Sequence, residues 1–292
     1  MLLVTGATGM SGQLVVREFA RAGTPVRALA RSPAKARAAG LGDLRGVDLV
    51  EGDMRRPDTL GAALDGVERV LMISGAAPDM METQCTFIDA CKAAGVRHVV
   101  KFSGGEPGFD PNKFRFTRMH EEIEDHLEGS GLAWTHLRPS QFMQVYLREA
   151  PDIAATGTLR LPFANISLSP IDAEDIARIA HRLLRDGGHE GESLDMTGPE
   201  ALTMDEIAAG ISASIGKPVK YVAITPEERR RNLLARGLPE GFVDALDEQT
   251  GERLKNPVAK VLTAAHRIFD VQPTRFADFA RRHAREFGGP AA

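Results

Sequence analysis

The chain contains little cysteine, tyrosine or tryptophan. Its 292 residues include two cysteines, two tyrosines and one tryptophan. Cys85 and Cys91 fall on one expected helix, where their spacing points them to different faces, so a local disulfide or a cysteine metal site is not expected. This sparse use of cysteine predicts a cytoplasmic protein with reduced thiols.

An excess of basic residues and a long apolar run are also lacking. The chain carries 36 basic and 40 acidic residues, a formal net charge of −4. Broad electrostatic binding to nucleic acid needs a basic surface, so a nucleic-acid partner is not expected. No apolar stretch approaches the roughly 20 residues that span a bilayer. The first residues also lack the basic start and cleavage site of a signal peptide, so a membrane partner is not expected.

A glycine loop opens the chain. The apolar residues 1–4 lead into the sequence GATGMSG, which contains Gly6, Gly9 and Gly12, and helix-like residues 13–20 follow at once. A strand, a glycine turn and a helix in this order bind a dinucleotide pyrophosphate, because amide groups and the helix dipole at a helix N-terminus favour negative charge. We therefore expect nucleotide contacts from the loop. The expected cofactor-binding residues here are Gly6, Thr8, Gly9, Met10 and Gly12.

Strand-like and helix-like segments alternate through the first half of the chain. This alternation predicts an α/β fold, a Rossmann-type doubly wound parallel sheet with helices on both faces. After residue 139 the pattern becomes mixed, and we expect a smaller C-terminal α+β lobe. The expected strands are residues 25–30, 47–51, 67–73, 96–102, 134–137, 193–196 and 219–223. The expected helices are 32–39, 57–64, 80–94, 117–128, 142–148, 173–185 and 204–215.

The second expected strand ends in Ala-Arg-Ser, without the acidic residue that usually accepts hydrogen bonds from the ribose of NAD. Arg31 can instead pair with the 2′-phosphate of NADP(H), and Lys35 lies one turn further on. The alternative is a solvated arginine. Asp53, followed by Met54, could accept a hydrogen bond from adenine or be an ordinary loop aspartate. We therefore expect NADP(H) as cofactor.

Two regions of the chain are expected. Residues 1–150 are expected to form the NADP-binding Rossmann domain, and residues 151–292 a mainly substrate-binding lobe interleaved with the sheet.

Several segments together resemble one family. They are VTGATGMSG, VRALARSP, EGDMRRPDTL, GVRHVVKFS, HEEIEDHLEGSGLAWTHLRPSQFM, SPIDAEDIARIA and LDMTGPEALTMDEIA. The set is similar to NmrA-like proteins, an atypical branch of the short-chain dehydrogenase/reductase superfamily, and the resemblance fades after about residue 228. It implies a Rossmann fold with a small lobe, NADP(H) binding and a cleft between the two. Members include reductases of quinones, dyes or phenylpropanoids, and redox sensors without turnover.

The catalytic residues typical of the superfamily are not all present. The usual serine position is Ser103, but the tyrosine position holds Phe116 and the lysine position holds His120. Phenylalanine cannot transfer a proton, so the usual Tyr-Lys relay is absent. We expect Ser103 and His120 at the site, both near the cofactor, because related quinone and triphenylmethane dye reductases resemble this chain in having a histidine there. The alternative is that His120 only pairs with Glu124 on the same helix. His120 and Glu121 also match the start of a zinc HExxH motif, but Glu124 occupies the position of the second histidine, so no metal is expected.

Other candidates surround this site. Ser74 and Gly75 follow the fourth strand at the carboxyl edge of the sheet, where ligands bind, and Pro139 lies in a segment that in the family passes near the nicotinamide. Tyr146 could reach the cleft or pack beneath the lobe, and residues 104–109 form a glycine-rich loop that could cover a substrate. The arginines at 229–231 are expected on a solvated helix face. Met80, Met81, Phe142 and Met143 could form an apolar pocket.

Two functions follow as hypotheses. The first is an NADPH-dependent oxidoreductase that transfers hydride to a small organic acceptor (a quinone, enone, imine or dye) without the Tyr-Lys relay. The second is a non-catalytic NADP(H)-binding sensor of the NmrA type, which would need a protein partner. An epimerase or dehydratase of nucleotide sugars ranks last, since it relies on the same missing pair. A homodimer is compatible with either function.

Overall fold

A seven-stranded parallel sheet forms the body of the computed structural model, which describes residues 1–104, 114–255 and 259–290. The strand order is β3-β2-β1-β4-β5-β6-β9, and every neighbouring pair is parallel. The strands are β1 (Leu2–Val4), β2 (Val26–Ala30), β3 (Val47–Glu51), β4 (Arg69–Met72), β5 (His98–Phe102), β6 (Ala133–Pro139) and β9 (Glu192–Met196).

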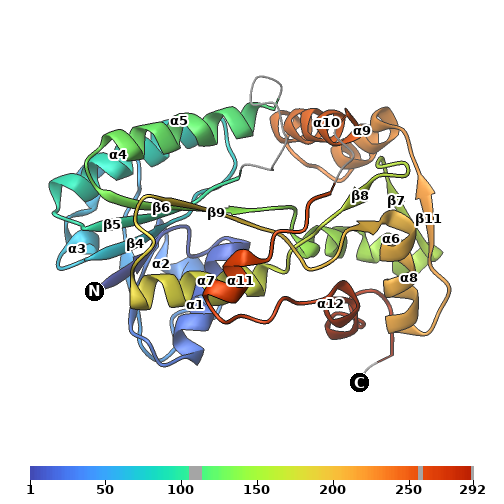
Figure 1. The fold of residues 1–292 in the computed structure, drawn as a ribbon, viewed down its shortest axis with the longest axis horizontal. Coiled ribbons are helices and arrows are strands. Elements are labelled where there is room, and N and C mark those ends of the chain that lie inside the picture. The colour runs from blue at the N-terminus through green and yellow to red at the C-terminus, as the bar shows by residue number, and fades with distance from the viewer. Residues whose placement is uncertain (105–113, 256–258, 291–292) are drawn as a thin grey trace.

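Helices cover both faces of the sheet (Figure 1). One apolar core packs α1 and α7 on the sheet, through side chains such as Phe19 and Leu183, and the other packs α3, α4 and α5, through Phe87 and Ile123. This is the doubly wound arrangement predicted from the alternating pattern. The helices of the body are α1 (Met10–Arg21), α2 (Pro33–Ala38), the 3-10 turn η1 (Pro57–Thr59), α3 (Gly61–Leu64), α4 (Met80–Ala93), α5 (Arg115–Gly129), α7 (Ala173–Asp186) and α11 (Ala264–Ile268).

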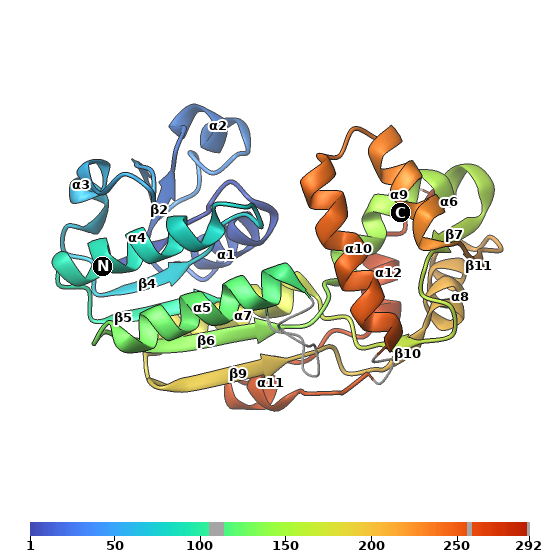
Figure 2. The ribbon, with the colours of Figure 1, turned by 90° about the horizontal axis from the view of Figure 1, so that it is seen from above.

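A smaller lobe lies beside the carboxyl ends of the strands (Figure 2). It has its own apolar core and two short two-stranded sheets, β7 with β11 and β8 with β10. Its elements are the 3-10 helix η2 (Met143–Glu149), α6 (Ala150–Thr156), β7 (Thr158–Leu161), β8 (Ser167–Leu168), β10 (Leu202–Thr203), α8 (Met204–Ile215), β11 (Lys220–Ala223), α9 (Pro226–Ala235), α10 (Glu240–Lys255) and α12 (Phe276–Arg282).

The sequence pattern misplaced some local structure. The sequence pattern predicts no strand at 157–170, but β7 and β8 lie there, and the helix expected at 57–64 divides into η1 and α3. The strand expected at 193–196 is present as β9, and it extends the main sheet because it pairs in parallel with β6. No helix within the described ranges is both long and apolar enough to cross a bilayer.

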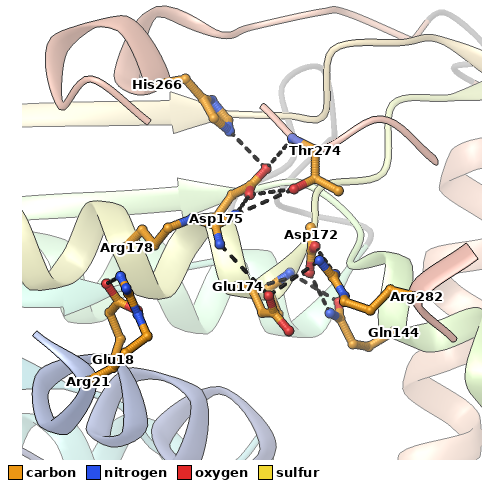
Figure 3. A network of polar contacts seen from close by, with 11 residues as sticks. Glu18, Arg21, Gln144, Asp172, Glu174, Asp175, Arg178, His266, Thr274 and Arg282 are labelled. Atoms are coloured by element: carbon orange, nitrogen blue, oxygen red, sulfur yellow. Dashed lines mark hydrogen bonds and ion pairs between the residues drawn. The ribbon is translucent and has the colours of Figure 1, made fainter. Parts of the chain in front are cut away.

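A buried polar network, here called the clasp, ties the C-terminal segment to α7 (Figure 3). Asp175 is fully buried and accepts hydrogen bonds from the Thr274 amide and hydroxyl, both at 2.7 Å. The same carboxylate pairs with Arg178 and lies 3.4 Å from His266 Nε2. Burial raises the pKa of Asp175, but these donors outweigh it and leave the pKa below its ordinary value.

The neighbouring carboxylate of the clasp is the N-cap of α7. Asp172 accepts hydrogen bonds from the Glu174 amide at 3.0 Å and from Gln144 Nε2 at 2.7 Å, and it pairs with Arg282 of α12. One side chain therefore joins η2, α7 and α12. The clasp fixes the lobe against the sheet body.

Candidate functional site

A groove of about 600 Å³ runs along the carboxyl ends of β1 to β4. It is the position at which open α/β sheets bind their ligands. Ten of the residues expected to bind the cofactor line it: Gly6, Thr8, Gly9, Met10, Gly12, Arg31, Asp53, Met54, Ser74 and Gly75.

Two loop glycines are required by close backbone contacts. Gly6 has a φ of +60°, and a Cβ there would lie 2.7 Å from the carbonyl oxygen of Ile73. A Cβ on Gly12 would lie 2.1 Å from the carbonyl oxygen of Gly6. Gly9 caps α1, whose first turn holds no acidic residue. The loop thus brings the helix N-terminus to the groove with its amide groups unobstructed, a geometry that fits a dinucleotide pyrophosphate.

Arg31 and Asp53 mark the end of the groove away from the lobe. Arg31 follows β2 with an exposed side chain, as the phosphate hypothesis needs, whereas Lys35 is not among the lining residues. Asp53 accepts a hydrogen bond from the Arg55 amide at 3.0 Å. Burial opposes ionisation of Asp53, but Arg55 outweighs it and lowers the pKa, so the carboxylate is charged.

A second cavity, the acceptor pocket, opens beside the groove and has a volume of about 390 Å³. Ser103, His120 and Pro139 line this pocket and not the groove. Phe116, at the usual tyrosine position, is also part of its wall. Six phenylalanines give the pocket its aromatic character: Phe102, Phe114, Phe116, Phe142, Phe163 and Phe242.

A buried lysine that the sequence reading missed underlies the pocket. Lys101 of β5 is fully buried and donates hydrogen bonds to Ser103 Oγ and to His120 Nδ1, each at 2.8 Å. Burial lowers the pKa of Lys101 to about 7, although the negative charge of Glu124 acts in the opposite direction. A lysine in a strand covered on both faces was the available sign, because every side chain of such a strand is normally apolar.

The contact with Lys101 sets the tautomer of His120. Burial and the nearby lysine charge lower the pKa of His120 well below its ordinary value, so the imidazole is neutral. Its Nδ1 accepts from Lys101, which leaves the proton on Nε2. A Cβ on Gly104 would lie 2.7 Å from this nitrogen, so glycine at 104 gives the ring its space.

Glu124 does not pair with His120, the alternative considered from sequence. It accepts a hydrogen bond from Ser103 and forms an ion pair with Arg138. Burial raises its pKa, but Arg138 and Ser103 outweigh burial and lower it. The five side chains Lys101, Ser103, His120, Glu124 and Arg138 form a continuous polar chain under the pocket, here called the relay network.

The remaining candidates divide between pocket and core. Met80 and Phe142 line the acceptor pocket, whereas Met143 is buried in the lobe core and Met81 is exposed. Tyr146 is fully buried against Phe276, with ring centroids 5.4 Å apart, and so packs beneath the lobe. Of the loop 104–109, residues 105–109 lie outside the described part of the chain.

The arginine triplet at 229–231 is not one solvated face. Arg229 pairs with the buried Glu149 at 2.7 Å and lines the acceptor pocket. Arg230 joins α9 to α10 through Asp244 and Asp247, both at 2.7 Å. Arg231 alone is largely exposed. Helical periodicity puts the three side chains in different surroundings.

The chain has clear counterparts among known proteins. A quinone oxidoreductase from Escherichia coli, solved with NADPH, superposes with a TM-score of 0.84 at 27% identity, covering 97% of this chain and 99% of that one. An NAD(P)H azoreductase from Xenophilus azovorans is 38% identical over 288 residues, 99% of each chain.

Another relative and a family model complete the comparison. The (4-alkanoyl-5-oxo-2,5-dihydrofuran-3-yl)methyl phosphate reductase of Streptomyces griseus is 33% identical over 294 residues, 98% of this chain and 99% of the relative. The model of the NmrA-like family matches residues 1–272. With that match over most of its length, the chain belongs to the NmrA-like family.

Proposed function

We propose that this protein is an NADPH-dependent oxidoreductase that delivers hydride to a flat, conjugated acceptor such as a quinone or an azo dye. The relatives described above are named as reductases, one of them an azoreductase and another a quinone oxidoreductase, which supports the reaction class. The observation that carries the proposal is the continuity of the groove with the acceptor pocket. Five residues line both cavities: Ser11, Ile73, Ser74, Ala76 and Arg148.

The groove residues divide the binding of NADPH between them. The N-terminus of α1 would hold the pyrophosphate, and Arg31 would pair with the 2′-phosphate. When bound, the reduced nicotinamide supplies the hydride. The aromatic wall of the pocket, including Phe116, would stack on a planar acceptor and exclude water from it.

The relay network can provide the proton that a reduced quinone or azo group takes up. His120 donates its Nε2 proton to the acceptor, while Nδ1 takes a proton from the Lys101 ammonium. The imidazole stays neutral through this exchange and changes only its tautomer. After the product leaves, water in the pocket reprotonates Nε2, and Nδ1 returns its proton to the buried Lys101 amine, which restores the starting tautomer. The Lys101 pKa of about 7 allows this amine to take up the proton near neutral pH. The missing tyrosine is therefore replaced by two residues.

The alternative of a non-catalytic sensor has less support. Its motivation was the absent Tyr-Lys pair, and the Lys101–His120 pair offers another path for the proton. The two relatives above 30% identity described here are both named as reductases. We therefore do not adopt the sensor function.

Turnover with a panel of acceptors tests the proposal. We expect the protein to oxidise NADPH in the presence of quinones, azo dyes, triphenylmethane dyes, enones or imines. The reaction is measured as the loss of absorbance of the reduced nicotinamide. Arg31→Ala should weaken NADPH binding at least tenfold and NADH binding little, because only NADPH carries the 2′-phosphate. Arg45→Ala, an exposed arginine outside the groove, is the matched control. Tight NADPH binding without turnover of any acceptor would contradict the proposal.

A further inference from the structure

Three arginines line the acceptor pocket: Arg148 of η2, Arg229 of α9 and Arg253 of α10. Within the described residues, the pocket wall contains no aspartate or glutamate. The whole chain carries a net charge of −4, so this concentration of cations does not follow from a basic composition. A positively charged cavity with apolar walls raises the local concentration of anionic ligands.

Two of the arginines are held in place by neighbours. Arg229 donates to Glu149, which is buried, also accepts from Arg236, and is absent from the pocket lining. Arg253 donates to the side-chain oxygen of Gln141, and its guanidinium lies 5.8 Å from the centre of the Phe163 ring. These contacts fix the arginine side chains at the wall.

Arg148 differs from the other two. Within the described residues, its guanidinium makes no hydrogen bond and no ion pair, and its side chain is exposed in part. The nearest acidic side chain in sequence, Glu149, is already occupied by Arg229 and Arg236. Arg148 also lines both the acceptor pocket and the nucleotide groove. An unpaired cation thus stands where the two ligands would meet.

We infer that the preferred acceptor carries an anionic oxygen group, a sulfonate, carboxylate or phosphate, on its conjugated ring system, and that Arg148 binds this group. The inference rests on the proposed function. The planar guanidinium donates two parallel hydrogen bonds to such oxygens. The aromatic wall takes the ring, and Arg229 adds positive charge beside the anion. The same charges disfavour a cationic acceptor, which gives the pocket selectivity by repulsion as well as by attraction.

A matched pair of acceptors tests this inference: ortho-naphthoquinone and its ring-sulfonated derivative. Arg148→Gln should lower kcat/KM for the sulfonate roughly tenfold to a hundredfold, mainly through KM, because a charge-assisted hydrogen bond is lost. The neutral quinone should change less than about twofold. Arg231→Gln, an exposed arginine of α9 outside the pocket, removes the same charge and should alter neither acceptor.

Equal losses for both acceptors would overturn the inference, and so would a rise in KM for NADPH, which would assign Arg148 to the cofactor. Calorimetric titration of both acceptors into the protein with NADP⁺ separates binding from turnover. If the protein reduces the neutral quinone but its binding of the sulfonate does not depend on Arg148, the proposed function stands and the inference about the anion site is wrong. If Arg148→Gln abolishes binding of the sulfonate but neither quinone is reduced, the proposed function is wrong and the anion site stands.

Discussion

The relay network and the clasp are both buried and polar, but their charges are arranged differently. In the clasp, Asp175 receives four donor contacts and each of its oxygens is occupied. In the relay network, the cation Lys101 contacts a hydroxyl and an imidazole and, among the described residues, no carboxylate. A fully paired buried charge holds elements together, whereas an unpaired one has its pKa moved toward neutrality and can exchange protons.

Breaking the clasp should produce the largest loss of stability. Asp175→Asn keeps the side-chain shape but leaves Arg178 and the Thr274 donors without their charged acceptor. We expect the free energy of unfolding to fall by about 3–5 kcal/mol, measured by urea denaturation. The activity per folded molecule should change less than about twofold.

The ion pair Glu18–Arg21 of α1, also drawn in Figure 3, provides the control for this variant. Arg21→Gln should alter the free energy of unfolding by at most about 0.5 kcal/mol, because Arg21 is exposed and an i,i+3 pair with an exposed partner contributes little. Similar losses from both substitutions would show that the clasp is not a special source of stability.

Breaking the relay network should affect turnover more than stability. Lys101→Met keeps a long side chain in the core and removes the proton source of His120. We expect kcat to fall about tenfold to a hundredfold, with KM for the acceptor little changed. The loss of stability should be smaller than that of Asp175→Asn. A kcat equal to that of the unaltered protein would remove Lys101 from the proton path.

The pH dependence sharpens the comparison further. Protonated Lys101 is the form that donates, so kcat should fall as pH rises through about 7, and Lys101→Met should lose this inflection. The contribution of Lys101 to the free energy of unfolding changes with pH in the opposite direction. Between pH 7 and 10.5 the unfolded lysine binds a proton that the folded one lacks, so this residue makes the folded state relatively more stable as pH rises. A kcat profile that is flat between pH 6 and 9 would contradict the relay.

Much of the fold could be predicted because its determinants are local. The glycine loop, the short helix expected at 32–39 and the alternation of strands and helices each depend on neighbouring residues, and the structure has them where expected. The place of β9 at the edge of the sheet depends on pairing with β6, across more than fifty residues that include both lobe elements and α7. Periodicity cannot report such a partner.

The same division applies to the candidate site. Ten expected cofactor residues come together in one groove, because strand ends of a parallel sheet meet at one edge. Lys101 was missed because its role in the site depends on its contact with His120 of α5. Arg148 was missed because only the folded lobe brings it to the groove. Burial and the absence of a charged partner are properties of the tertiary structure.

The late position of β9 in the chain has a consequence for synthesis on the ribosome. The groove lining, apart from Arg148, is complete once Thr83 has been made. β6, in contrast, presents an unpaired edge until Met196 has left the ribosome and β9 can bind it. An exposed edge of a parallel sheet is open to pairing with other nascent chains. The growing protein therefore acquires its nucleotide site before it has closed its own sheet.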